Sequence, residues 1–284
     1  MVEPKRNLGR AGLAIGAVVV LAGAGALALQ LARPSRPAPV EQAKPVVVVQ
    51  AEDAVPTLIE KLPLPPPALG RDALLGAAAV AANAYAAGAP APAGNATLVG
   101  RAFTLRLPFG CAAAADPVAT WTYNVERKTV KFSAQPNLWG KAPWVRTLAG
   151  DTPFDAVEGF WVQRPWTQSK ACPAAPADAV DPAAPAPKET LGLAQFFAPG
   201  ASRTRQRGTR PYEFTRKYEG EGTPPGHEYQ LVLSGRLAAF ADGQPVRCWS
   251  ESSWLRPRCL IAAELTRVAF EDPAIGETLA EWRD

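Results

Sequence analysis

The chain alternates apolar and polar side chains along FTLRLPF, residues Phe103–Phe109. A period of two places the apolar residues on one face of an extended strand and residues such as Thr104 and Arg106 on the other. The pattern returns in Trp121–Val125 and in Tyr229–Leu237. These segments predict a mainly β fold of antiparallel strands, arranged as a sandwich or a barrel.

Further elements surround these strands. The segments Val130–Phe132, Val157–Gln163, Pro245–Glu251 and Arg258–Phe270 are also expected to be strands, with turns at Glu126–Lys128 and Ala241–Gln244. Residues 71–87 are rich in Ala and Leu and end before Gly88, which predicts a helix. Asp272 and Pro273 suit the N-cap and first position of a short terminal helix.

The chain divides by composition. We expect a tail at 1–10, a transmembrane helix at 11–32, a Pro-rich linker at 33–68, a helix with a first β subdomain at 69–172, an Ala/Pro-rich loop at 173–187, and a second β subdomain with a short C-terminal helix at 188–284. The similar runs Leu98–Phe103 and Leu233–Leu237 favour two β subdomains. Chance resemblance between apolar strands explains these runs equally well.

The segment Ala11–Ala32 has no charged residue, and only Gln30 is strongly polar. Its length as a helix is about 33 Å, enough to cross a hydrocarbon core of about 30 Å. Basic residues outnumber acidic ones before it, which places the N-terminus in the cytoplasm and the remainder outside. A cleaved signal peptide is the alternative, because Ala26-Leu27-Ala28 resembles a cleavage site. Either reading exports the chain beyond residue 32.

The sequence also bears on the oligomeric state and the location. Gly12 and Gly16 form a Gly-x-x-x-Gly motif, which allows a homodimer through the membrane helix, although small residues are simply abundant here. Heavy use of Ala, Pro and Arg is typical of a GC-rich bacterium. The expected location is therefore the bacterial inner membrane, with the C-terminal domain in the periplasm.

The four cysteines all lie on the exported side, where the compartment is oxidising and disulfides form. We predict the pairs Cys248–Cys259 and Cys111–Cys172. Zinc is rejected, because the chain has no Cys-x-x-Cys and its single histidine, His227, is distant from the cysteines in sequence.

Two clusters are candidate binding sites. The basic run Ser202–Lys217 suits phosphate or carboxylate groups of envelope polymers, or anionic headgroups. Tryptophans in loop contexts suit sugar rings or partner proteins, although filling the core is the competing reading. The candidate binding residues are Arg203, Arg205, Arg207, Arg210, Trp139, Trp144 and Trp166.

Signals for catalysis are weak. His227 lies in a Pro/Gly turn without a nucleophile motif. Asp151, Asp155 and Glu158 cluster near aromatic residues, but their spacing defines no cleft. We expect no catalytic residue, no metal and no cofactor, since no phosphate-binding glycine motif or EF-hand loop is present.

The architecture favours a non-enzymatic binding or assembly component of the envelope. The alternatives are an envelope enzyme acting on glycans through Asp or Glu residues and a purely structural envelope protein. The expected partners are the inner-membrane bilayer and envelope proteins or anionic envelope polymers. Nucleic acid is excluded by location and by a net charge of only +4.

Overall fold

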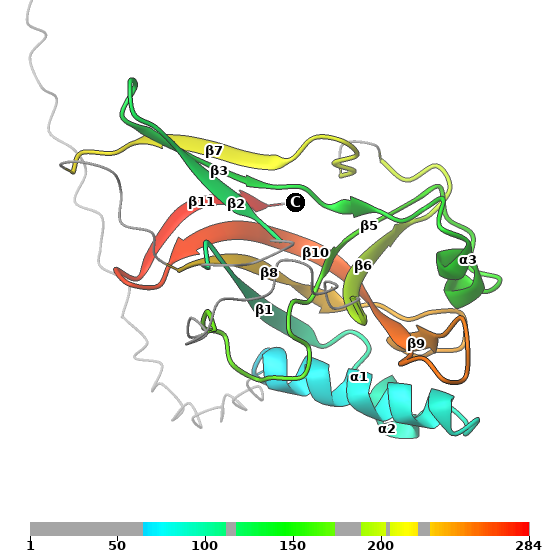
Figure 1. The fold of residues 1–284 in the computed structure, drawn as a ribbon. Coiled ribbons are helices and arrows are strands. Elements are labelled where there is room, and N and C mark those ends of the chain that lie inside the picture. The colour runs from blue at the N-terminus through cyan, green and yellow to red at the C-terminus, as the bar shows by residue number, and fades with distance from the viewer. Residues whose placement is uncertain (1–64, 112–117, 174–188, 203–204, 221–227, 284) are drawn as a thin grey trace, which may run out of the picture. The chain divides into compact units, whose positions relative to one another are not determined.

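The computed structural model describes residues 65–111, 118–173, 189–202, 205–220 and 228–283 (Figure 1). The predicted membrane segment 11–32, most of the linker 33–68, nearly all of the loop 173–187, and His227 lie outside these residues. Among the helices that the structure describes, none is long and apolar enough to cross a membrane.

Three helices and eleven strands are formed by the described residues. The helices are α1 (Arg71–Ala86), α2 (Ala93–Ala96) and α3 (Pro143–Ala149). The strands are β1 (Ala102–Phe109), β2 (Thr120–Asn124), β3 (Thr129–Ala134), β4 (Asn137–Leu138), β5 (Ala156–Trp161), β6 (Leu191–Phe197), β7 (Tyr212–Lys217), β8 (Tyr229–Leu237), β9 (Val246–Trp249), β10 (Arg258–Asp272) and β11 (Glu277–Arg283). The mainly β fold is confirmed, and so is the helix predicted at 71–87.

The strands form two sheets. The larger has the order β1-β8-β10-β6-β5-β4, with β9 and β11 also paired to β10. Its pairs are antiparallel except for β6 with β10, which run parallel. The smaller sheet has the antiparallel order β2-β3-β7. Strand β10 is the hub of the larger sheet because it pairs with four other strands along its 15 residues.

The division into two β subdomains is wrong for the described residues. Strand β10 pairs with β6 and β6 with β5, so the larger sheet joins strands from both sides of residues 173–187. The smaller sheet also mixes the two halves, because β7 pairs with β3. The similar runs around Gly100 and Gly235 belong to adjacent regions of the β1–β8 pair. Long-range strand pairing thus overrides the composition boundary.

The predicted C-terminal helix is also wrong, because strand β11 occupies that segment and forms a hairpin with β10. The Oδ1 atom of Asp272 accepts a hydrogen bond from the backbone N–H of Ala274 at 3.0 Å. Gly276 has a φ of +67°, which continues the turn. The Asp-Pro signal therefore starts a turn, since an aspartate side chain closes either structure locally.

The core lies between the elements that Figure 1 shows stacked in layers: the smaller sheet, the larger sheet and α1. The apolar residues of Phe103–Phe109 are buried, as their period of two predicts. Aromatic rings join the two sheets: the centroid of Phe132 on β3 lies 4.9 Å from Tyr229 on β8 and 5.9 Å from Phe270 on β10. The ring centroids of Tyr212 on β7 and Trp282 on β11 lie 5.3 Å apart, so β7 also packs against the larger sheet.

Both predicted disulfides are confirmed. Cys111 is bonded to Cys172, which ties the end of β1 to the segment before residues 174–188. Cys248 is bonded to Cys259, and the two residues are directly opposite each other in the β9–β10 pair. Within the described residues, no cysteine is free.

Candidate functional site

A gap in strand pairing forms along one edge of β10. Residues Cys259–Ala262 pair there with β6, and Arg267–Asp272 pair with β11. Residues 263–266 pair with neither strand, because the pairing with β6 ends at Ala262 and the pairing with β11 begins at Arg267. The side chain of buried Gln195 compensates, since its Oε1 accepts a hydrogen bond from the Leu265 N–H at 3.2 Å.

The backbone of β10 is irregular at the same place. Its pairing with β8 shifts register between Leu265 and Arg267, as at a β-bulge. Gly235 of β8 lies opposite this shift, and a Cβ atom there would collide with the carbonyl oxygen of Glu264. Glycine is therefore required at position 235 for the two strands to approach, and the irregularity lies at the same residues of β10 as the gap.

A pocket of about 180 Å³ occupies this gap. Its walls come from β5, β6, β10 and β11 and from the segment that leads into β7. We call it the arginine pocket, because four arginines line it: Arg205, Arg207, Arg267 and Arg283. Glu158, Gln195, Tyr212 and Trp282 also contribute to its walls.

Glu158 fixes the loop that carries two of these arginines. Its buried carboxylate accepts hydrogen bonds from the backbone N–H groups of Arg207, at 2.9 Å, and Gly208, at 2.8 Å. The guanidinium of Arg207 lies 4.5 Å from the ring centroid of Tyr212, and its Nη2 donates to the carbonyl of Pro211 at 2.6 Å. Among the described residues, Arg207 pairs with no carboxylate side chain, and its buried Nε has no hydrogen-bond partner.

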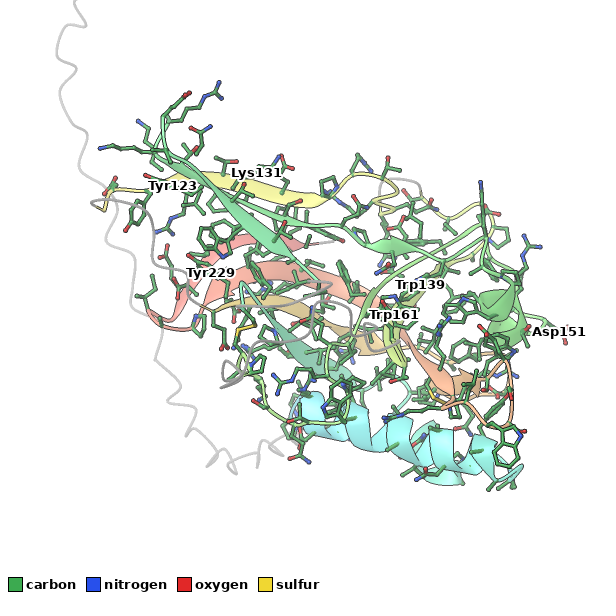
Figure 2. All side chains as sticks on the ribbon, viewed as in Figure 1. Tyr123, Lys131, Trp139, Asp151, Trp161 and Tyr229 are labelled. Atoms are coloured by element: carbon green, nitrogen blue, oxygen red, sulfur yellow. A yellow bond between two sulfur atoms is a disulfide. The ribbon has the colours of Figure 1, made fainter. Side chains whose placement is uncertain are left out.

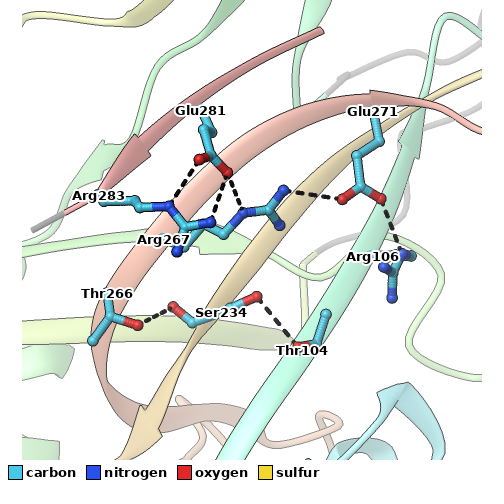
Figure 3. Close-up of polar contacts among 8 residues, drawn as sticks. All are labelled: Thr104, Arg106, Ser234, Thr266, Arg267, Glu271, Glu281 and Arg283. Atoms are coloured by element: carbon cyan, nitrogen blue, oxygen red, sulfur yellow. Dashed lines mark hydrogen bonds and ion pairs between the residues drawn. The ribbon is translucent and has the colours of Figure 1, made fainter. Parts of the chain in front are cut away.

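The other two arginines belong to a network of alternating charges, which Figure 3 shows. Glu281 lies between them and accepts from Arg283 Nε and from Arg267 Nε, both at 2.8 Å. Arg267 also contacts Glu271 at 3.2 Å, and Glu271 pairs with Arg106 at 3.3 Å. The hydrogen bonds from Arg283 and Arg267 lower the pKa of Glu281 from 4.5 to about 2. This network holds two cations at the pocket while partly neutralising them.

The structure separates the predicted basic residues. Arg205 and Arg207 line the pocket, whereas Arg203 lies outside the described residues. The side chain of Arg210 is exposed and turns back to the carbonyls of Gln206 and Arg207. Arg216 pairs instead with Glu277 of β11 at 3.4 Å. The basic run therefore contributes two described arginines to the pocket.

The predicted tryptophans are also divided. Trp139 is buried and lies 6.1 Å from Trp144 and 4.7 Å from Trp161 between ring centroids, and Figure 2 labels Trp139 and Trp161 near α3. The guanidinium of Arg258 lies 5.1 Å from the ring centroid of Trp144 and 5.6 Å from that of Trp161. Trp166 stands apart, with 59% of its surface exposed. Trp139 therefore fills the core.

The three acidic candidates for catalysis do not share a site. Only Glu158 lines the arginine pocket, and it is engaged by two backbone amides. Asp155 is exposed and accepts from the Gly200 N–H at 3.1 Å, and Asp151 is exposed beside α3 (Figure 2). Over the ranges that the structure covers, no three or more His, Cys, Asp or Glu side chains are grouped to hold a metal ion.

Three lining residues were not predicted from the sequence: Arg267, Arg283 and Gln195. The available signal was Thr266-Arg267 within the apolar strand Arg258–Phe270, since a polar pair in a central strand indicates an irregularity or a site. Arg283 carried no signal, because its place beside Arg267 depends on the β10–β11 hairpin.

Comparison of the chain with family models, curated proteins and solved structures finds no match. The site's chemistry therefore rests on its own geometry.

Proposed function

We propose that the chain is a single-pass membrane protein of the bacterial envelope, whose exported domain binds anionic groups through the arginine pocket. Its role is binding or assembly. The observation that carries the proposal is that four arginines meet at one pocket, and Arg207 has no carboxylate partner among the described residues.

The chemistry of the pocket favours a carboxylate or a phosphate. Guanidinium groups bind both with paired, charge-assisted hydrogen bonds. The pocket measures about 180 Å³, whereas pockets that enclose drug-sized ligands measure about 300–1,000 Å³. An acidic group carried by a larger molecule fits better than an enclosed cofactor, and an anionic envelope polymer or an acidic segment of an envelope protein presents such groups.

The proposed location is the inner membrane, with residues 1–10 in the cytoplasm, 11–32 spanning the bilayer and the β-rich domain in the periplasm. The two disulfides support export, since such bonds persist in oxidising compartments. Within this proposal the domain is a β-sandwich, because the smaller sheet packs its aromatic face on the larger one. A Pro-rich linker at 33–68 joins the domain to the proposed membrane helix.

The location is tested by alkaline carbonate extraction of membranes from cells that express the chain. We expect the full-length chain to stay in the membrane fraction. Release of a chain that lacks its N-terminal segment would establish the cleaved signal peptide and overturn the anchor.

Binding is tested by titrating the detergent-solubilised full-length chain with polygalacturonate, with polyphosphate and with neutral dextran. We expect at least one of the two polyanions to bind and dextran not to bind. The affinity for the polyanion should fall as the salt concentration rises from 50 to 300 mM. Over this range the Debye screening length drops below about 10 Å, which weakens attraction between exposed charges. Equal binding of dextran, or binding that salt does not weaken, would contradict an arginine-based site.

A further inference from the structure

The loop between β9 and β10 presents an apolar tip to solvent. Trp254 has 95% of its surface exposed, and Leu255 has 45%. Arg256 follows directly and is exposed. We call residues 254–256 the tryptophan tip. An exposed aromatic side chain next to an exposed leucine leaves apolar surface uncovered, which is unfavourable in water.

Several contacts hold the β9–β10 loop that carries the tryptophan tip. The Cys248–Cys259 disulfide and the Trp249–Arg258 pair close the loop. Inside it, the Ser250 Oγ donates to the carbonyl of Ser252 at 2.6 Å. The Ser250 N–H donates to the hydroxyl of Tyr85 at 3.2 Å, which ties the loop to α1. A loop fixed in this way loses little conformational entropy when its tip is buried by a partner.

We infer that the tryptophan tip inserts into the interface of a lipid bilayer with anionic headgroups. This inference rests on the proposed function, because it needs the domain to work beside a membrane. Tryptophan is favoured at the level of the headgroups, where its ring is buried and its N–H stays hydrated. Arg256 then faces the negatively charged lipid surface, and its charge is complementary to it.

The shape of the tip favours a bilayer over a protein surface as the occupant. Trp254 projects almost fully from the loop, so a protein would need a matching pocket, whereas a bilayer accepts a projecting side chain without one. A single aromatic and a single aliphatic side chain bind lipid weakly on their own. The predicted anchor at 11–32 offsets this weakness, because a tether raises the effective concentration of the membrane near the tip.

The chain offers a direct test, because all eight tryptophans lie between Trp121 and Trp282 and none lies in residues 1–64. The full-length chain is placed in liposomes of phosphatidylcholine and phosphatidylglycerol that contain brominated acyl chains, which quench only nearby tryptophan fluorescence. We expect bromolipid-specific quenching in the original chain. Trp254→Phe should reduce the quenched fluorescence by at least about twofold, since only an interfacial ring reaches the bromine atoms.

Trp166→Phe is the matched control, because Trp166 is also exposed but lies in another loop. It should leave the quenched fluorescence unchanged. Arg256→Gln should weaken quenching in anionic liposomes and leave it unchanged in pure phosphatidylcholine. Absence of quenching in the original chain, or equal loss in the Trp254→Phe and Trp166→Phe variants, would overturn the inference and leave a protein partner as the occupant. Failure of the chain to float with liposomes would instead overturn the proposed anchorage.

Discussion

Arg71 illustrates how one side chain can organise a loop. It is 1% exposed, yet it is charged and lies at the start of α1. Its Nε donates to the carbonyl of Thr167 at 3.0 Å, and its Nη2 donates to the carbonyls of Gln163 at 2.6 Å and Arg164 at 2.9 Å. Burial, and then the nearby cation of Arg164, lower the pKa of Arg71. The loop before the Cys111–Cys172 disulfide thus closes around a guanidinium.

Substitution of Arg71→Met should destabilise the domain by about 2–3 kcal/mol, because it leaves carbonyl groups without a donor. Urea denaturation of the detergent-solubilised full-length chain measures the loss. Arg127→Met is the control, since Arg127 is exposed in the β2–β3 turn. Equal stability of the two variants would show that Arg71 does not hold the loop.

Glu281 should make stability depend on pH. Its pKa is about 2 in the folded chain, below its ordinary value of 4.5, because Arg283 and Arg267 donate hydrogen bonds to its charged form. A lowered carboxyl pKa contributes stability that is fully present above the ordinary value and is lost as pH falls through the folded value. The contribution of Glu281 should therefore disappear between pH 4.5 and about 2.

The measurement compares melting temperatures of the original chain and Glu281→Gln across this pH range. The variant should melt at a lower temperature at neutral pH, and the difference should shrink as the pH approaches 2. Glu126→Gln serves as the control, because Glu126 lies exposed in a turn. A difference that stays constant with pH would rule out the charged network as its source.

Among the strands, β5 and β6 depend on glycines that make room for Trp139. A Cβ atom on Gly159 would lie 2.5 Å from the Trp139 ring and would also meet the carbonyl oxygen of Leu193. A Cβ atom on Gly192 would lie 2.8 Å from the same ring. The buried ring of Trp139 therefore fits only where both neighbouring positions, 159 and 192, are glycine.

Gly159→Ala should destabilise the domain by about 2–4 kcal/mol, because backbone on one side and a buried ring on the other cannot both move away. Gly76→Ala is the contrasting variant: Gly76 is exposed inside α1, and a Cβ atom there meets nothing within 4 Å. It should stabilise the helix by about 0.5–1 kcal/mol. Thermal unfolding of both variants checks the pair, and a neutral Gly159→Ala would refute the packing argument.

Strands β1, β2 and β3 were predictable because their side chains alternate, and α1 was predictable from its composition and from Gly88. Strands β4, β6, β7 and β11 were not predicted. The pairing of β6 with β10 was not, since it depends on contacts between residues far apart in sequence. The basic run indicated Arg205 and Arg207 because these residues are close in sequence. Arg267 and Arg283 could not be predicted, because they reach the pocket only through the β10–β11 hairpin. The helix expected after Asp272 failed because strand pairing outweighed a local capping signal.

For the chain as a whole, the disulfides differ in the length of chain they close. Cys111 and Cys172 are 61 residues apart, whereas Cys248 and Cys259 are 11 apart. Loop-closure entropy predicts stabilisation by about 4 kcal/mol for the longer loop and about 3 kcal/mol for the shorter one. Paired Cys→Ser variants measured by urea denaturation should follow this order. A larger loss from the Cys248–Cys259 pair would show that local strand packing outweighs chain entropy.

The two disulfides, the interleaved strands and the gap beside β10 combine in one arrangement: a β-rich domain that gathers arginines from three separate segments at one pocket. Ion pairs with Glu281 hold Arg267 and Arg283 in place. Hydrogen bonds to Glu158 hold the loop that carries Arg205 and Arg207. Anion binding at this pocket is the function that we propose for the domain.

The most direct test is the affinity of two charge-matched variants of the full-length chain, Arg207→Gln and Arg210→Gln, for the polyanion that the original chain binds. Both lose one positive charge from the same loop, but only Arg207 lines the pocket. We expect Arg207→Gln to bind about tenfold more weakly, which corresponds to the loss of about one charge-assisted hydrogen bond, and Arg210→Gln to bind like the original chain. Equal weakening of the two variants would show that binding follows net charge and would contradict a site in the arginine pocket.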